Sequence, residues 1–194
     1  LPRALGQSAR PRAMIRPLGA GDAAAYAALS LEGIQTFPEA FLRTEAEAKA
    51  VPLEALARML DGGRMHGAFD GDILVGFAGL EFRPWATAQH RAHIGPFYVT
   101  PSHQGTGLAR RILDYAEGVA LAQNVTQLEL WVAVENLRAR TLYTDFGFRA
   151  MGRMPGAVIL DGRPRDDLFM VRDLTEPAPA PGGDGLRRLT RGDW

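Results

Sequence analysis

One stretch of the sequence decides how the rest is interpreted: His93-Ile94-Gly95-Pro96-Phe97-Tyr98-Val99, then Thr100-Pro101-Ser102-His103, then Gln104-Gly105-Thr106-Gly107-Leu108-Ala109-Arg110-Arg111. It predicts an apolar, aromatic-rich strand, a short turn, and an amphipathic helix opened by a glycine segment. This order of elements presents backbone N–H groups at the start of a helix, where they can bind a phosphate group. The stretch therefore predicts an anion site but does not identify the anion.

The composition is that of an ordinary globular protein. The 194 residues suit one domain, with 46% hydrophobic and 23% charged residues. The net charge is zero, with 22 basic and 22 acidic residues, so we expect no general attraction to nucleic acid or to an anionic membrane. Cysteine is absent, which removes thiol nucleophiles and thiolate metal ligands. No apolar run approaches the roughly 20 residues of a membrane-spanning helix, and the N-terminus lacks the apolar core of a signal peptide, so a cytoplasmic location is expected.

The chain divides into three parts. Residues 1–12 contain prolines and arginines with little apolar periodicity, and we expect a flexible arm there. Residues 175–194 are rich in proline and glycine, and we expect a disordered tail. Residues 13–174 are expected to form the single folded domain.

Strand and helix patterns are interleaved along this domain. Helices are expected over residues 22–34, 52–60 and 136–146, and from about residue 108 onward. Strands are expected over residues 13–18, 65–69, 73–82, 93–99, 128–134, 148–160 and 166–174. Such a mixed order predicts an α/β (α+β) domain.

Two of the expected strands form a hairpin. Asp70-Gly71 between them is a strong hairpin signal. Gly76 and Gly79 in the second strand suggest a bend or a close backbone contact.

Three anion-binding patterns compete for the glycine segment. The Walker pattern G-x-x-x-x-G-K-[ST] is absent. A Rossmann fingerprint needs glycine or alanine where Arg110 stands, and no acidic residue closes a second strand about 20 residues on, where Asn124 and Gln127 stand. The third pattern, Q/R-x-x-G-x-G/A, is matched by Gln104, Gly107 and Ala109.

This third pattern, after a strand of the form apolar-aromatic-Val-x-Pro, resembles the signature of the GNAT superfamily of N-acetyltransferases. A second block is similar too: Leu128-Glu129-Leu130-Trp131-Val132, then Asn136, Ala139, Leu142-Tyr143 and Phe146-Gly147-Phe148. The resemblance covers about residues 14–174. It implies a mixed, mostly antiparallel sheet of six to seven strands flanked by about four helices, with acetyl-CoA as cosubstrate and no metal.

Coenzyme A is expected to bind along the opening stretch. Backbone N–H groups of residues 105–109 suit its pyrophosphate, because the helix dipole and the hydrogen bonds act together; the alternative is that the glycines serve only a tight turn. The resemblance implies that Phe97 and Val99 bind the pantetheine arm like an added strand. It also implies that an N–H near Phe97 or Tyr98 polarises the thioester carbonyl. The expected cofactor contacts are Phe97, Tyr98, Val99, Gln104, Gly105, Thr106, Gly107, Leu108, Ala109 and Asn136.

Two of the expected site residues have a structural alternative. Asn136 either contacts the cofactor or serves only as the N-cap of its helix. Tyr143 stands where the superfamily often has a tyrosine that protonates the departing thiolate, and its phenol is chemically able to do so. The alternative is that Tyr143 is a core-facing aromatic residue.

The base that deprotonates the amine has three candidates. In several GNAT members a glutamate does this, six residues before the apolar residue that ends the strand, and counting back from Val99 gives His93. An imidazole suits the task, directly or through water. Glu81 on the preceding strand and Glu32 in the first helix are alternatives. The other histidines are expected at the surface or in turns, and not as a metal site: His66, His90 and His103.

The leading hypothesis is an N-acetyltransferase that uses a ternary complex, with direct attack of a primary amine on acetyl-CoA. The acceptor is a small molecule, an amino acid or a protein N-terminus, and the sequence does not choose among them. The alternative is a GNAT-fold sensor or scaffold that binds acyl-CoA without turnover. No nucleic-acid or membrane partner is expected, and a homodimer is compatible with the sequence.

Overall fold

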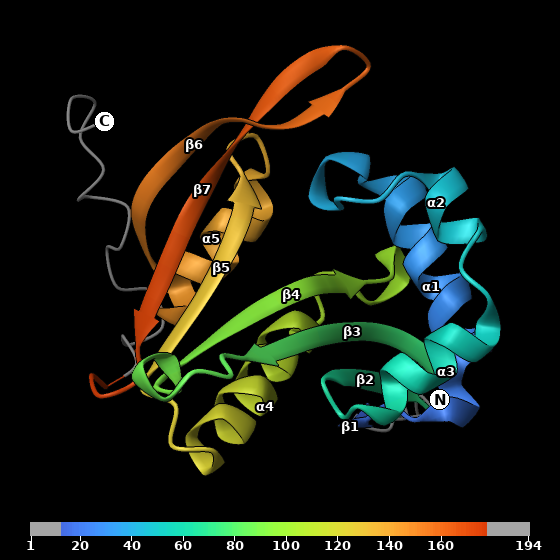
Figure 1. Ribbon diagram of the computed structural model, residues 1–194, viewed down its shortest axis with the longest axis horizontal. Helices are drawn as coiled ribbons and strands as arrows, with labels where there is room; N and C mark the ends of the chain where they lie inside the picture. Colours follow the sequence, from blue (N-terminus) through green and yellow to red (C-terminus); the bar gives the residue numbers. More distant parts are fainter. Residues whose placement is uncertain (1–12, 178–194) are drawn as a thin grey trace, which may run out of the picture.

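A seven-stranded sheet runs through the molecule in the order β1-β2-β3-β4-β5-β7-β6 (Figure 1). The computed structural model describes residues 13–177, so the predicted arm and most of the predicted tail lie outside the described residues. All neighbouring strands are antiparallel except β4 and β5, which confirms the mixed, mostly antiparallel sheet. The strands are β1 (Met14–Pro17), β2 (Met65–Asp70), β3 (Ile73–Phe82), β4 (Arg91–Val99), β5 (Gln127–Ala133), β6 (Arg149–Leu160) and β7 (Arg163–Asp173).

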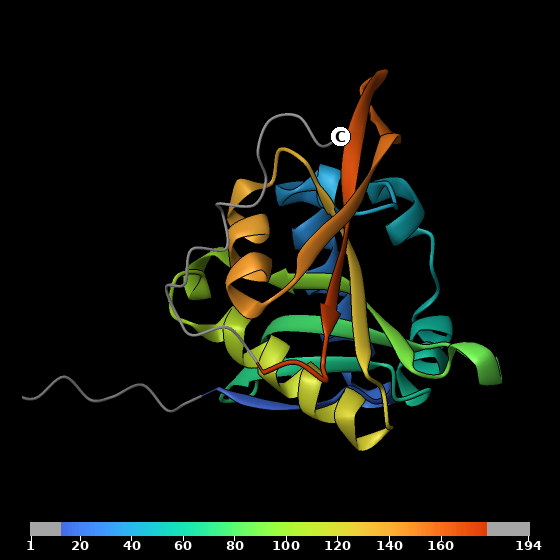
Figure 2. The same ribbon diagram turned by 90° about the vertical axis from the view of Figure 1, so that its left-hand side faces the viewer.

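Helices cover both faces of the sheet, and Figure 2 shows α4 and α5 on one side with α2 and α3 on the other. The described chain has five α-helices: α1 (Ala23–Thr36), α2 (Glu45–Lys49), α3 (Leu53–Asp61), α4 (Leu108–Ala122) and α5 (Leu137–Phe146). α1 and α3 pack on Phe77 and Tyr98, whereas α4 packs on Ala78 and Val99. Neighbouring residues of one strand thus face opposite helical layers, as the alternation of a strand requires.

Helix α2 is absent from the sequence-based prediction. It has five residues, too few to show an apolar period. A capping box holds it instead, in which Glu47 N–H donates to the side chain of Thr44 and the Glu47 carboxylate accepts from Thr44 N–H at 2.8 Å.

The sheet splits between β4 and β5 (Figure 1). The two strands pair only over residues 91–93 and 127–129. Immediately beyond, Gly95 and Pro96 of β4 together oppose the single residue Gly79 of β3, which is a β-bulge. A Cβ on Gly79 would lie 2.4 Å from the carbonyl oxygen of Gly95, so the close backbone contact suggested by this glycine is confirmed.

The bulge reverses which residues of β4 face which side. Ile94 before it and Phe97 after it both pack toward α4 and α5, although they are an odd number of residues apart. His93 alternates with the buried Ala92 and Ile94, so it lies on the opposite face. The bulge therefore separates a segment that presents His93 from a segment that presents Tyr98 on that same face.

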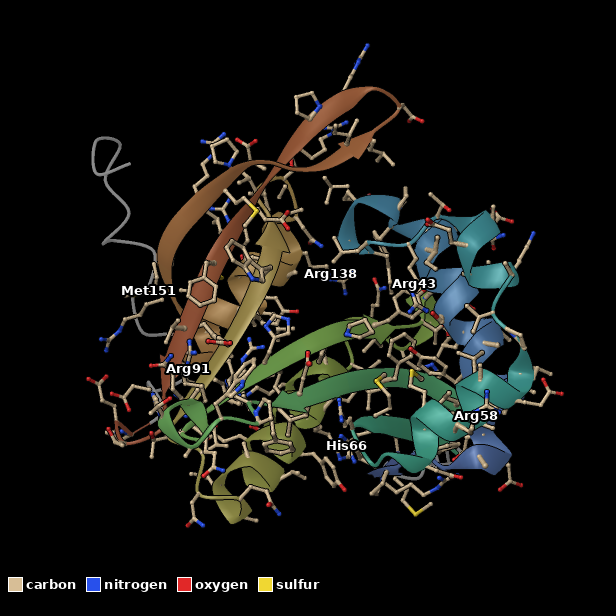
Figure 3. The ribbon with its side chains drawn as sticks, in the orientation of Figure 1. Arg43, Arg58, His66, Arg91, Arg138 and Met151 are labelled. Carbon is tan, nitrogen blue, oxygen red and sulfur yellow. The ribbon has the colours of Figure 1, made fainter. Side chains whose placement is uncertain are left out.

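One sequence-based expectation about a histidine is wrong. His66 is not a surface or turn residue; it lies in β2 with 3% of its surface exposed (Figure 3). Its ring packs against Tyr115 of α4, with the ring centroids 5.3 Å apart. The reason is long-range, because a helix 49 residues further along the chain covers this position, and no local pattern reports that.

Candidate active site

The turn between β4 and α4 is shaped by two glycines. Gly105 and Gly107 have φ of 78° and 83°, a left-handed conformation that costs a residue with a Cβ about 1–2 kcal/mol. Gly107 is the N-cap of α4, and the helical hydrogen bonds begin with Arg111 N–H, which donates to Gly107 O at 3.2 Å. The N–H groups of residues 108–110 precede that bond. They are therefore the groups that a helix start offers to an anion.

Side chains brace this turn against its neighbours. Gln104 Nε2 donates to Val99 O at 2.8 Å, which ties the turn to the end of β4. Thr106 Oγ1 donates to His103 O at 2.6 Å within the turn. Gln104 Oε1 in turn accepts from a guanidinium of α5, that of Arg138, at 2.5 Å.

Arg138 is a candidate site residue that the sequence did not predict. Its Nη2 lies 3.9 Å from the position that a Cβ on Gly105 would take, so a positive charge stands beside the glycine turn (Figure 3). The charge adds to the positive end of the α4 dipole. Arg138 belongs to the first turn of α5, 34 residues from Gln104, and its place depends on how α5 docks beside α4. The sequence carries no local signal for it.

Asn136 caps α5. Its Oδ1 accepts a hydrogen bond from Ala139 N–H at 3.0 Å. The described contacts of its side chain are thus those of the N-cap alternative.

The expected pantetheine-binding segment lies where the sheet splits. The ladder between β4 and β5 ends at His93, so Phe97–Val99 have no strand partner on that edge among the described residues. An open strand edge can pair with an extended ligand, as a further strand would. Tyr98 and Val99 are buried on opposite faces, which holds the backbone of this edge between α1 and α4.

Tyr143 lies against this edge and in the core at once. It is 7% exposed, and its ring packs edge-on against Phe97 and Phe148, with centroid distances of 6.2 and 5.8 Å. Burial raises the pKa of Tyr143 well above its usual value. The phenol therefore keeps its proton at neutral pH, the form that a proton donor needs.

His93 lies at the point where β4 leaves β5. A Cβ on Gly95 would lie 3.1 Å from His93 Nε2, so the imidazole extends along the strand over the bulge. Burial lowers the pKa of His93, while the nearby Glu129 acts in the opposite direction. A neutral imidazole at physiological pH is able to accept a proton.

The two alternative bases occupy different places. Glu81 is exposed and lies directly opposite His93 in the β3–β4 pairing. Glu32 of α1 instead accepts hydrogen bonds from Tyr98 Oη at 2.9 Å and Thr100 Oγ1 at 2.6 Å. Burial, followed by the Glu32 carboxylate, raises the pKa of Tyr98 to about 12. Glu32 thus ties α1 to the end of β4, whereas Glu81 is grouped with His93.

A second set of charges near His93 was also missed. Glu129 of β5 is 2% exposed and forms ion pairs with Arg83 and with Arg91. Arg91 is labelled in Figure 3. The available signal was weak but present, because Glu129 stands between Leu128 and Leu130 in an otherwise apolar strand.

Residues 13–177 contain neither a candidate metal site nor a candidate membrane-spanning helix. No group of three or more His, Asp or Glu side chains in that range could hold a metal ion. No helix of the same range is both long enough and apolar enough to cross a membrane.

Known proteins share both sequence and fold with this chain. The Acetyltransferase (GNAT) family model matches residues 28–148. N-alpha-acetyltransferase RimI of Mycobacterium tuberculosis is 32% identical over 133 residues, and the match covers 66% of this chain and 78% of that protein. A mycothiol acetyltransferase of Beutenbergia cavernae is 35% identical over 155 residues, with 69% of this chain and 52% of that protein covered. The chain thus spans at most about half the length of the mycothiol acetyltransferases it matches.

A solved structure extends the comparison to the fold. The acetyltransferase yncA of Salmonella typhimurium, solved with its cofactor acetyl-CoA, has a TM-score of 0.70 at 20% identity, and the match covers 87% of this chain and 97% of that chain. At 20% identity the structural similarity is evidence for the fold alone. Together with the family match over more than half of the sequence, these findings show that the chain belongs to the acetyltransferase (GNAT) family.

Proposed function

We propose that this chain is an N-acetyltransferase that transfers an acetyl group from acetyl-CoA to a primary amine by direct attack in a ternary complex. One observation carries the proposal: His93, the open edge of Phe97–Val99 and the glycine turn follow one another along a single strand–turn–helix unit. That is the order in which a base for the amine, a site for the thioester and a site for the pyrophosphate are needed.

The residues of the turn fit coenzyme A. The N–H groups of residues 108–110 begin α4, Arg138 adds a positive charge, and a Cβ on Gly107 would meet no atom within 4 Å. A phosphate group can therefore approach this backbone without a side chain in its way. Acetyl-CoA supplies an activated acyl group as a thioester.

Each catalytic group then has one task. His93 accepts a proton from the acceptor amine as the new N–C bond forms. A backbone N–H near Phe97 or Tyr98 donates to the carbonyl oxygen, because Pro96 has no N–H to offer. Tyr143 donates a proton to the sulfur as the C–S bond breaks, which leaves an amide and a free thiol. Return of the proton from His93 to Tyr143 through solvent restores both groups.

The acceptor side is bordered by a second segment. The 3₁₀ turn η2 (Pro38–Ala40), between α1 and α2, lies near β5 and β6. Its position favours a role in acceptor choice. The relatives carry the names of mycothiol, spermidine and N-alpha-acetyltransferases, so the acceptor class here is an amine of a small molecule, an amino acid or a protein N-terminus. A cytoplasmic location and a homodimer stay predictions from the sequence.

Titration calorimetry with acetyl-CoA, followed by free-thiol detection over a panel of amines, tests the proposal. We expect binding, and thiol release that depends on at least one amine. Binding without thiol release from any amine supports the sensor or scaffold alternative, and no binding at millimolar acetyl-CoA contradicts both.

Tyr143→Phe tests the proton donor. The ring that packs on Phe97 is kept and only the hydroxyl is lost, so we expect kcat to fall at least tenfold with an unchanged Kd for acetyl-CoA. An unchanged kcat removes Tyr143 from the mechanism and leaves it as a core residue.

A further inference from the structure

Glu129 is a buried charge that the mechanism above does not use. It lies in the middle of β5, 2% exposed, between strand neighbours that face the apolar core. A carboxylate taken out of water to this extent needs partners that compensate for the lost hydration.

Two arginines supply that compensation. Arg83, from the loop after β3, donates to Oε1 of Glu129 through Nε at 3.1 Å and also through Nη2. Arg91, at the start of β4, donates to Oε2 through Nη1 at 3.2 Å. Both oxygens of the carboxylate are engaged, so its position is defined from two directions.

The register of β4 and β5 places the Glu129 carboxylate beside the candidate base, His93. His93 and Glu129 are paired residues in the short parallel ladder of β4 and β5, and paired residues project from the same face of a sheet. Glu81 lies opposite His93 on the other side, in β3, but it is exposed. The charged groups around the imidazole are thus Glu129 from β5, Glu81 from β3, Arg83 from the loop and Arg91 from β4 itself.

We propose that Glu129, held by Arg83 and Arg91, is a positioning residue that acts through His93: its carboxylate stabilises the positive charge formed on the imidazole when His93 accepts a proton. This inference rests on the proposed function. A buried ion pair contributes little net stability, because desolvation offsets most of the attraction between the charges. Next to a base, however, the same carboxylate acts on the one state in which His93 is charged. Of the charged neighbours of His93, Glu129 has the largest effect on its pKa, and this effect is upward.

Glu129→Gln tests the proposal with a matched control. The variant keeps the shape of the side chain and removes its charge, so we expect the pKa of His93 to fall, the acidic limb of the kcat/KM profile to move to lower pH, and kcat to fall about threefold to tenfold, as expected for a weaker base. KM for the amine should change little. The control is Glu117→Gln in α4, which also breaks an arginine–glutamate pair, with Arg172 at 3.0 Å, but lies on the other face of the sheet. It should leave the pKa of His93 and the pH profile unchanged.

A second variant has the opposite expected sign. Arg83→Gln removes a cation that lowers the pKa of His93, so that pKa should rise. Because Arg83 is partly exposed, this variant also serves if Glu129→Gln does not fold. Glu129→Asp keeps the charge and should recover part of the lost kcat.

NMR titration measures the pKa of the His93 imidazole directly, and the His93→Asn variant serves to assign its signal. This readout needs no turnover, so it tests the coupling even if no amine is acetylated and the proposed function fails. An unchanged His93 pKa in Glu129→Gln overturns the proposal. So does an equal loss of kcat when Glu129→Gln is made in the His93→Asn background, because the effect then does not pass through His93.

Discussion

The two ends of β4 are built in different ways. At its C-terminal end the glycine turn consists of consecutive residues, and the groups proposed to bind an anion are its backbone N–H groups. At its N-terminal end the charges around His93 come from three strands and a loop, with Glu129 and Arg83 46 residues apart. An anion site made of backbone groups depends on φ and ψ, whereas the charges around a side-chain base depend on sheet register.

Substitutions at the two ends of β4 should therefore change different kinetic quantities. Substitutions near His93 should lower kcat and leave the Kd for acetyl-CoA unchanged, because the backbone turn stays intact. Substitutions in the turn should raise the Kd for acetyl-CoA and leave kcat at saturating cofactor nearly unchanged.

The largest effect is expected for His93→Ala. Loss of a general base lowers kcat by about 10²–10⁴-fold, and the Kd for acetyl-CoA should not change because the glycine turn is untouched. The control is His90→Ala, another histidine near the start of β4, which is exposed and should behave as the wild type. Steady-state kinetics and calorimetry measure the two quantities; a kcat within threefold of wild type would exclude His93 as the base.

The next largest effect is expected for Gly107→Ala, in the glycine turn that follows β4. At a φ of 83° the added methyl group costs about 1–2 kcal/mol, although the space around it is open. We expect the Kd for acetyl-CoA to rise about tenfold, with kcat at saturation nearly unchanged. Gly118→Ala, in the middle of α4 and also with open space around it, is the control. It should stabilise the helix by about 0.5–1 kcal/mol and leave the Kd unchanged; equal Kd values for both variants contradict the anion role of the turn.

Arg138→Gln should have a smaller effect at the same end. The loss of one partly solvated charge beside Gly105 should raise the Kd for acetyl-CoA about threefold to tenfold at low salt, and less at high salt. The charge-matched control is Arg149→Gln, because Arg149 on β6 forms a surface ion pair with Glu176. Calorimetry at two salt concentrations measures the difference, and a Kd that is as salt-dependent as in the wild type argues against a phosphate contact.

The smallest effect concerns His66, a buried histidine whose pKa is shifted by burial. Burial lowers its pKa in the folded state, so the unfolded chain binds the proton more readily. The free energy of unfolding should therefore fall as the pH is lowered from about 6.5 toward the pKa of the folded state. His66→Leu should flatten this slope in urea titrations at pH 5 to 8. An unchanged slope means that another group controls it.

Local backbone requirements could be predicted from the residue types alone. The hairpin after Asp70, the helix end at Gly147 with φ of 105°, and the left-handed glycines at 105 and 107 each follow from what a few neighbouring residues can adopt. The same holds for the close contact of Gly79, since only glycine leaves room for it.

Tertiary structure alone decided which side chains meet. Nothing local indicates that Glu129 stands beside His93, that Arg138 reaches Gly105, or that His66 is buried under α4. These contacts join residues 33 or more positions apart, and each depends on strand register or helix docking. A sequence pattern reports the conformation of adjacent residues, whereas a side-chain cluster also depends on how distant elements pack. For that reason the glycine turn proposed to bind the cofactor could be predicted from the sequence, and the surroundings of the proposed base could not.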